Sequence, residues 1–159
     1  NSGKDMMGND LKGATDLFPG AVVTPEANPI EPQLMKFEKK VKAGARFFQT
    51  QAVYDLSKFR EFMKVARQFD VKILAGILLL KNAGMANYLN KFVPGITVPE
   101  FLIEELKSAG KEKALDKGIE IAARQIRELK EDMVCDGVHI MAIGLEGKVP
   151  LIMEIAGLL

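Results

Sequence analysis

Cysteine is nearly absent from this chain, which has Cys135 alone. One cysteine excludes an intrachain disulfide and cannot hold an iron–sulfur cluster, and it favours a reducing, cytoplasmic location. Histidine is equally scarce, since His139 is the only one. Because a metal site needs several ligands at compatible spacing, we expect no metal site, and we expect His139 to be a hydrogen-bonded residue within a strand.

An excess of charge and long hydrophobic runs are also missing. The formal net charge is +1, so no global charge favours nucleic acid or an anionic membrane surface as a partner. No apolar run approaches the roughly 20 residues of a membrane span. The 159 residues suit one domain, over residues 1–159, with a real core. Because the chain begins with Asn1, we expect a processed or truncated piece.

Alternation of short apolar runs with amphipathic segments is the main pattern that is present. Strands are predicted at residues 19–24, 47–51, 71–77 and 134–142. Helices are predicted at residues 10–17, 32–43, 56–69, 83–92, 98–109, 112–132 and 150–159. Gly44 is suited to closing one helix in the left-handed conformation, and Asp55 to capping the next.

Four consecutive strand–helix units predict a parallel sheet with right-handed crossovers. A complete (β/α)8 barrel needs eight such units and about 250 residues, so this α/β chain has half of one. We interpret it as the C-terminal half of a (β/α)8 TIM barrel, completed by a missing N-terminal half or by a second copy. The alternative is a small, open, doubly wound sheet.

Two glutamines stand where the second predicted strand ends. Ligands bind at the carboxyl ends of strands in parallel α/β sheets, so Gln49 and Gln51 are candidate binding residues. Amides suit the holding of a polar heterocycle better than the breaking of a bond. Taken alone, Gln51 is better explained as a cap on backbone groups, and Gln49 fits barrel lining and ligand binding equally well.

Several motifs occur in an order and spacing that resemble one family. They are residues 22–29 (VVTPEANP), 39–45 (KKVKAGA), 50–55 (TQAVYD), 75–77 (AGI), 98–99 (VP), 118–119 (GI) and 137–139 (GVH). Together they resemble the carboxyl-terminal part of the catalytic domain of 5,10-methylenetetrahydrofolate reductase, a flavin-dependent (β/α)8 barrel. The resemblance implies hydride transfer from reduced flavin to the methylene carbon of a folate, which gives methyltetrahydrofolate.

The resemblance also implies roles for particular residues. Gln51 takes the position of the strand-end glutamine that contacts folate. The flavin, FAD or FMN, is implied to be held by loop and helix residues at the positions of Thr24, Asn28, Lys36, Lys39 and Lys40. Many members have histidine at the position of Asn28. Without the resemblance, the lysines indicate a solvated helix face.

Two positions depart from the family pattern. Well-known members present a glutamine and a phenylalanine, four residues apart, toward nicotinamide or folate, and here the substrate-binding candidates at these positions are Met85 and Leu89. The departure favours electron delivery by an iron–sulfur partner subunit, as in some anaerobic relatives. No carboxylate matches the acidic residues in the family's amino-terminal half. A non-catalytic half-barrel subunit or fragment, or a pterin-dependent methyltransferase barrel, therefore stays open as an alternative.

Overall fold

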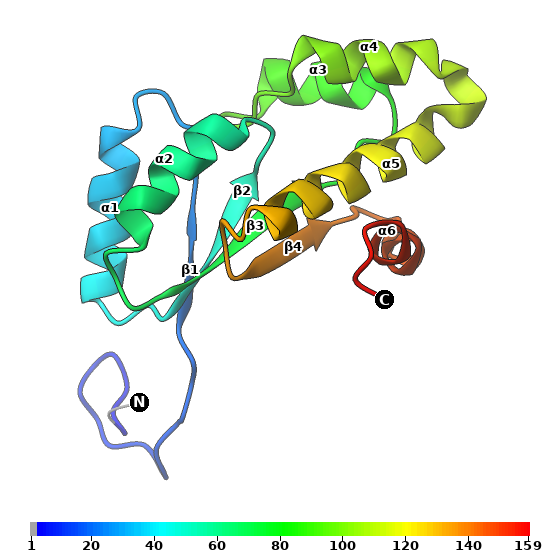
Figure 1. Cartoon of the computed structure of the whole chain (residues 1–159). Helices are drawn as coiled ribbons and strands as arrows, with labels where there is room; N and C mark the ends of the chain where they lie inside the picture. Colours follow the sequence, from blue (N-terminus) through cyan, green and yellow to red (C-terminus); the bar gives the residue numbers. More distant parts are fainter. Residues whose placement is uncertain (1–2) are drawn as a thin grey trace.

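Four parallel strands form one sheet in the computed structural model, which describes residues 3–159. They lie side by side in chain order (Figure 1) and are β1 (Gly20–Val23), β2 (Phe47–Ala52), β3 (Lys72–Leu78) and β4 (Gly137–Met141). A doubly wound sheet reverses its strand order, and this sheet does not. The doubly wound alternative is therefore wrong. The architecture is consistent with part of a TIM-barrel-like fold.

Helices alternate with the strands. They are α1 (Glu31–Lys42) after β1, α2 (Leu56–Ala66) after β2, then α3 (Ala83–Phe92), α4 (Glu100–Ser108) and α5 (Gly110–Glu131) after β3, and the short η1 (Glu146–Lys148) and α6 (Val149–Ile155) after β4. Gly44 has φ of +101° and follows α1, as expected. Asp55 accepts a hydrogen bond from the Lys58 N–H at the start of α2, so the predicted cap is confirmed.

One predicted helix is wrong. Residues 10–17 form no helix, and their neighbourhood instead contains an isolated antiparallel bridge between Lys4 and Asp10. Gly8 and Gly13 take positive φ values of +87° and +96°, which a right-handed helix does not allow. Leu11 and Leu17 are exposed, so burial of their side chains gives little support to a helix here.

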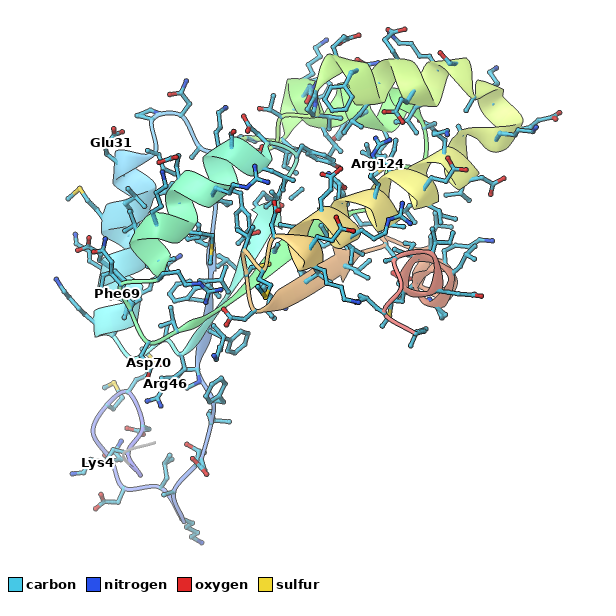
Figure 2. The ribbon with its side chains drawn as sticks, in the orientation of Figure 1. Lys4, Glu31, Arg46, Phe69, Asp70 and Arg124 are labelled. Atoms are coloured by element: carbon cyan, nitrogen blue, oxygen red, sulfur yellow. The ribbon has the colours of Figure 1, made fainter. Side chains whose placement is uncertain are left out.

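The main core lies between one face of the sheet and α1, α2, α5 and α6. Phe37 of α1 packs its ring against Phe48 of β2 and Phe62 of α2, with ring centroids 4.5 and 5.4 Å apart. A second core lies where β2 and β3 end, and α3, α4 and the segment between them contribute to it. Arg124 of α5 holds α4 in place through a two-pronged ion pair with Glu105 (Figure 2).

The opposite face of the sheet is more open. Alternate residues of β2 and β4 point away from the helices, and they include Gln49 and His139. On β1 the corresponding residue, Val22, is 64% exposed. Within residues 3–159, β1 and β4 each pair with one neighbour only. The sheet therefore presents an open face and two open edges.

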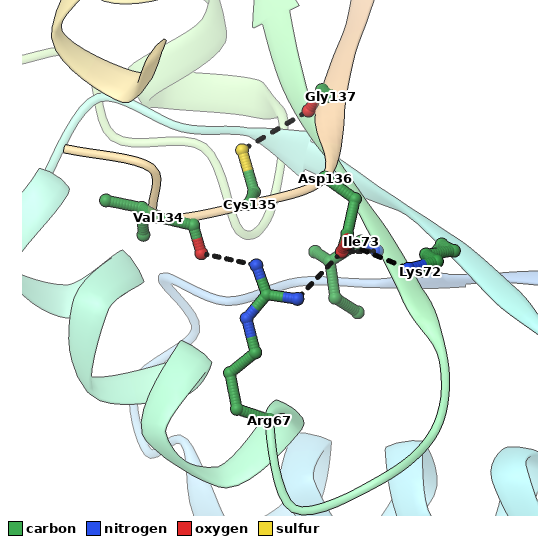
Figure 3. A network of polar contacts seen from close by, with 7 residues as sticks. All are labelled: Arg67, Lys72, Ile73, Val134, Cys135, Asp136 and Gly137. Atoms are coloured by element: carbon green, nitrogen blue, oxygen red, sulfur yellow. Dashed lines mark hydrogen bonds and ion pairs between the residues drawn. The ribbon is translucent and has the colours of Figure 1, made fainter. Parts of the chain in front are cut away.

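Asp136 joins three elements at the opposite end of the sheet from the glutamines (Figure 3). Its carboxylate accepts hydrogen bonds from the Ile73 N–H at 2.9 Å and from Arg67 at 3.0 Å, and it pairs with Lys72 at 3.4 Å. Burial raises the pKa of Asp136, but these contacts outweigh burial and leave the pKa below its usual value. Beside it, the half-buried thiol of Cys135 donates to the Gly137 carbonyl, and burial raises its pKa.

Asp136→Asn is expected to lower the free energy of unfolding by about 1–2 kcal/mol at neutral pH, since it removes the ion pairs. A lowered carboxyl pKa stabilises the fold above the ordinary aspartate pKa of about 3.9, and that stability is lost as the pH falls through the folded-state pKa. Urea unfolding should therefore show the difference shrinking toward about pH 2. The exposed Asp70→Asn is the matched control (Figure 2), and an equal loss there would contradict this role.

Candidate functional site

A bulge in β2 shapes the strand end that carries the glutamines. The pairing of β2 with β3 shifts between Gln49 and Ala52, so that an extra residue of β2 is accommodated. The Thr50 hydroxyl accepts from the Gly76 N–H at 2.8 Å and donates to the Gln51 carbonyl at 2.7 Å. Thr50 is thus a buried brace for the backbone of Gln51.

Gly76 is required by this packing. A Cβ at Gly76 would lie 2.5 Å from the Thr50 carbonyl oxygen and 2.7 Å from that of Gln51, closer than real Cβ atoms approach. A glycine there allows the bulged strand to approach β3, and it leaves the open face of β3 without a side chain at that point. This close packing explains why the AGI motif has glycine at position 76.

The segment that follows Gln51 is fixed by its neighbours. The buried Glu26, on the loop after β1, accepts from the N–H groups of Tyr54 and Asp55. Gln125 of α5 donates to the Val53 carbonyl at 3.1 Å, and the Tyr54 hydroxyl donates to the Leu78 carbonyl at 3.2 Å. The strand end is thus preorganised by side chains from several elements.

Burial is the largest influence on the pKa values of Glu26 and Tyr54, which support the strand end. Desolvation raises the pKa of Glu26 despite its two backbone hydrogen bonds, and the neighbouring Asp55 adds to the effect. Burial, then the charge of Glu26, raises the pKa of the Tyr54 phenol. Among the described residues, Oε2 of Glu26 and Oε1 of Gln125 are the buried side-chain oxygens without a hydrogen-bond partner. Glu26 therefore carries an unfavourably placed charge when ionised.

Gln51 itself keeps part of its amide free. Its Oε1 accepts from the adjacent Ala52 N–H at 3.1 Å, which is the backbone cap expected from sequence. Its Nε2 has no partner among residues 3–159, and the residue is partly exposed. The capping role and a donor role toward a ligand are therefore compatible.

The residues predicted to hold flavin lie around the β1 end and α1. Lys40 donates to the Val22 carbonyl at 2.6 Å, while Lys36 and Lys39 are exposed and have no ion pair within residues 3–159. Asn28 is exposed beside a cleft of about 650 Å³ between the loop after β1 and α2. Thr24 contacts the loop after α3, where a Cβ on Gly95 would lie 2.6 Å from Thr24 Cγ2.

Met85 and Leu89 both lie on α3, one turn apart. Leu89 is 7% exposed and belongs to the second core, and Met85 packs beside it while its sulfur accepts from the Lys81 N–H. In this structure Leu89 therefore serves packing, and the expected substrate role of both residues stays a prediction.

Sequence reasoning missed Glu26 and Gln125 as residues that shape the site. Glu26 lies between Pro25 and Ala27 in one of the recognised motifs, but a single carboxylate in a loop gave no sign of its partners. Gln125 lies among the buried apolar residues of α5, and a polar residue within such a run is the signal that could have been used.

The side chains gathered at the strand end are neutral amides, an imidazole and a hydroxyl. Such groups bind and orient a polar ligand. No group of three or more His, Cys, Asp or Glu side chains among residues 3–159 could hold a metal ion. In the same range, no helix combines the length and apolar character needed to cross a membrane.

The fold and the strand-end amides define a class: an α/β protein of repeated strand–helix units that presents a neutral polar site at its strand ends. The family model of methylenetetrahydrofolate reductase matches residues 3–157. The chain therefore belongs to the methylenetetrahydrofolate reductase family, and the resemblance read from its motifs is confirmed.

Two known proteins illustrate the relationship. Methylenetetrahydrofolate reductase 2 of Schizosaccharomyces pombe is 27% identical over 131 residues, which cover 76% of this chain and 20% of that protein. A solved structure of an uncharacterised Clostridium thermocellum protein that binds two copies of 5-methyl-5,6,7,8-tetrahydrofolic acid matches with a TM-score of 0.56 and 20% identity, over 91% of this chain and 55% of that one. The chain spans about a fifth of the yeast relative and about half of the bacterial one.

Proposed function

We propose that this chain contributes the folate-contacting part of a flavin-dependent reductase that converts 5,10-methylenetetrahydrofolate to 5-methyltetrahydrofolate. Family membership supports a folate-related reductase. The observation that carries the assignment is the preorganised strand end, where Gln51 offers a free amide donor beside a braced backbone. An uncharged amide can pair with a pterin without placing charge beside a hydride acceptor.

The same proposal includes the interpretation of this chain as half of a (β/α)8 barrel. Four strands in chain order are half of the eight in a closed barrel, so residues 1–159 form one partial domain. The open face and the open edges of β1 and β4 are the surfaces that an N-terminal half, or a second copy, would cover. We also propose a cytoplasmic location, because a single cysteine suits a reducing compartment.

The chemistry of α1 fits the phosphates of FAD or FMN. Lys36 and Lys39 are three residues apart, and within the described chain neither ammonium group has an ion-pair partner. Thr24 and Asn28 supply a hydroxyl and an amide on the adjoining loop, while Lys40 is engaged with the Val22 carbonyl. Flavin, when bound, supplies the hydride. Its own reduction is proposed to come through a partner subunit with iron–sulfur clusters.

Gln51→Leu in the assembled enzyme is expected to lower kcat/KM for the folate about ten- to a hundredfold, the loss that follows from removing a hydrogen bond to the ligand. Flavin content, measured by visible absorption, should stay unchanged. Gln68→Leu is the matched control, because Gln68 is exposed and its side-chain amide donates to the Lys64 carbonyl four residues earlier.

Unchanged folate kinetics in Gln51→Leu would contradict this role. A native mass spectrum and an absorption spectrum distinguish the alternatives. A colourless protein that still binds folate would favour a pterin-dependent methyltransferase. A species that binds a second polypeptide but neither flavin nor folate would favour a non-catalytic half-barrel subunit.

A further inference from the structure

Gln49 and His139 meet across the open face of the sheet although 90 residues separate them in the chain. Gln49 Nε2 lies 3.3 Å from His139 Nδ1. Gln49 is on β2 and His139 on β4, so β3 lies between them. In the sheet register Gly76 of β3 is directly opposite His139. The pair therefore spans three strands.

The absence of a side chain at Gly76 leaves the open face of β3 clear beside His139. Gly76, the neighbour of His139 on β3, brings no side chain to this face, and the close approach of the Thr50 and Gln51 carbonyls excludes even a Cβ there. The residues on either side of His139, Val138 and Ile140, pack into the main core and so fix the direction of the ring. The contact thus results from a bulge, a glycine and a strand alternation acting together.

The hydrogen bond determines which nitrogen of the ring remains available. An amide N–H that donates to Nδ1 requires Nδ1 to be unprotonated, so the neutral ring carries its proton on Nε2. Nε2 has no hydrogen-bond partner among the described residues, and the side chain is only partly buried. The open face therefore presents an oriented Nε2–H donor.

The surroundings of this donor indicate the class of ligand. No charged side chain occurs in β2 or β4, and Leu74 and Met141 provide apolar surface on the same face. A neutral, flat heterocycle with hydrogen-bond acceptors fits such a surface better than an anion does.

We propose that His139 contacts the ligand through Nε2–H, donating to an acceptor of the pterin ring, and that Gln49 is the positioning residue that fixes its tautomer. This inference rests on the proposed folate function and adds a second donor to Gln51. Because His139 is the only histidine, its ring nitrogens give unambiguous signals in ¹⁵N NMR spectra.

The test uses the protein with 5-methyltetrahydrofolate as the probe. We expect a neutral Nε2–H tautomer in the free protein and a shift of the Nε2 signal when the probe is added. His139→Ala should weaken binding about tenfold and Gln49→Leu about threefold, as expected for a lost hydrogen bond and a lost orientation. The double variant should bind no more weakly than His139→Ala, because Gln49 acts through the ring.

Each alternative outcome has a defined meaning. Additive losses in the double variant would overturn the positioning role, and so would an unchanged tautomer preference in Gln49→Leu. An unperturbed His139 signal at saturating probe would overturn the contact, even if the alanine variant failed to fold. If His139→Ala bound normally while Gln51→Leu bound weakly, this inference would fail and the proposed function would stand. If the unaltered protein in its complete assembly bound no folate, both would fail.

Discussion

Gly118→Ala is expected to destabilise the chain by about 3 kcal/mol or more, the upper range for overpacking of a filled core. Gly118 lies on α5 where the helix crosses the segment after β3. A Cβ built there would lie 1.8 Å from the Leu80 carbonyl oxygen and 3.0 Å from its carbon. The obstacle is backbone, so a rotamer change cannot relieve it, and α5 must move away from the sheet.

The sign of the expected change in stability distinguishes Gly118 from a glycine in an exposed helix. In an exposed helix, glycine to alanine adds up to about 1 kcal/mol of stability. Gly147→Ala is the matched control, since Gly147 has no neighbour within 4 Å of a built Cβ and no positive φ, and it should leave the free energy of unfolding nearly unchanged. Urea unfolding of both variants measures the difference. A stable Gly118→Ala protein would mean that α5 does not lie this close to Leu80.

Local chemistry explains why the elements themselves were predictable. The Asp55 cap, the left-handed Gly44 and the amphipathic pattern of α5 each depend on residues within one or two helical turns. The predicted bounds of α3 are the observed ones, and those of most other elements differ by one to three residues. The error at residues 10–17 also has a local cause, since Gly13 within this range and Gly8 just before it take positive φ values.

Long-range geometry explains what the sequence did not reveal. Gln49 was recognised as a candidate and His139 as a hydrogen-bonded strand residue, but their pairing depends on Gly76 and on a bulge that shifts the register. Glu26 likewise acts on N–H groups that are 28 and 29 residues away. Periodicity assigns a residue to one face of the sheet, but it does not reveal which residues of other strands it contacts there.

Glu26 provides the second large effect. Glu26→Ala is expected to lower the free energy of unfolding by about 2–3 kcal/mol, because it leaves the N–H groups of Tyr54 and Asp55 without their acceptor. Glu26→Gln should be far milder, since an amide oxygen can accept the same two hydrogen bonds and the amide brings no charge into the buried position. Comparison of the two variants separates the role of Glu26 as a hydrogen-bond acceptor from the effect of its charge.

The pH dependence provides the sharper test. Burial raises the folded-state pKa of Glu26 above its ordinary value, so its stabilising contribution is complete below the unfolded-state pKa of about 4.3 and is lost as the pH rises through the folded-state pKa. The stability of Glu26→Gln relative to the unaltered protein should therefore increase as the pH rises above the unfolded-state pKa. Urea unfolding across this range measures the difference, and other titrating groups cancel in it. A difference that stayed constant with pH would show that Glu26 ionises as readily in the folded chain as in the unfolded one, and a charged carboxylate would then hold the strand end that carries Gln51 at neutral pH.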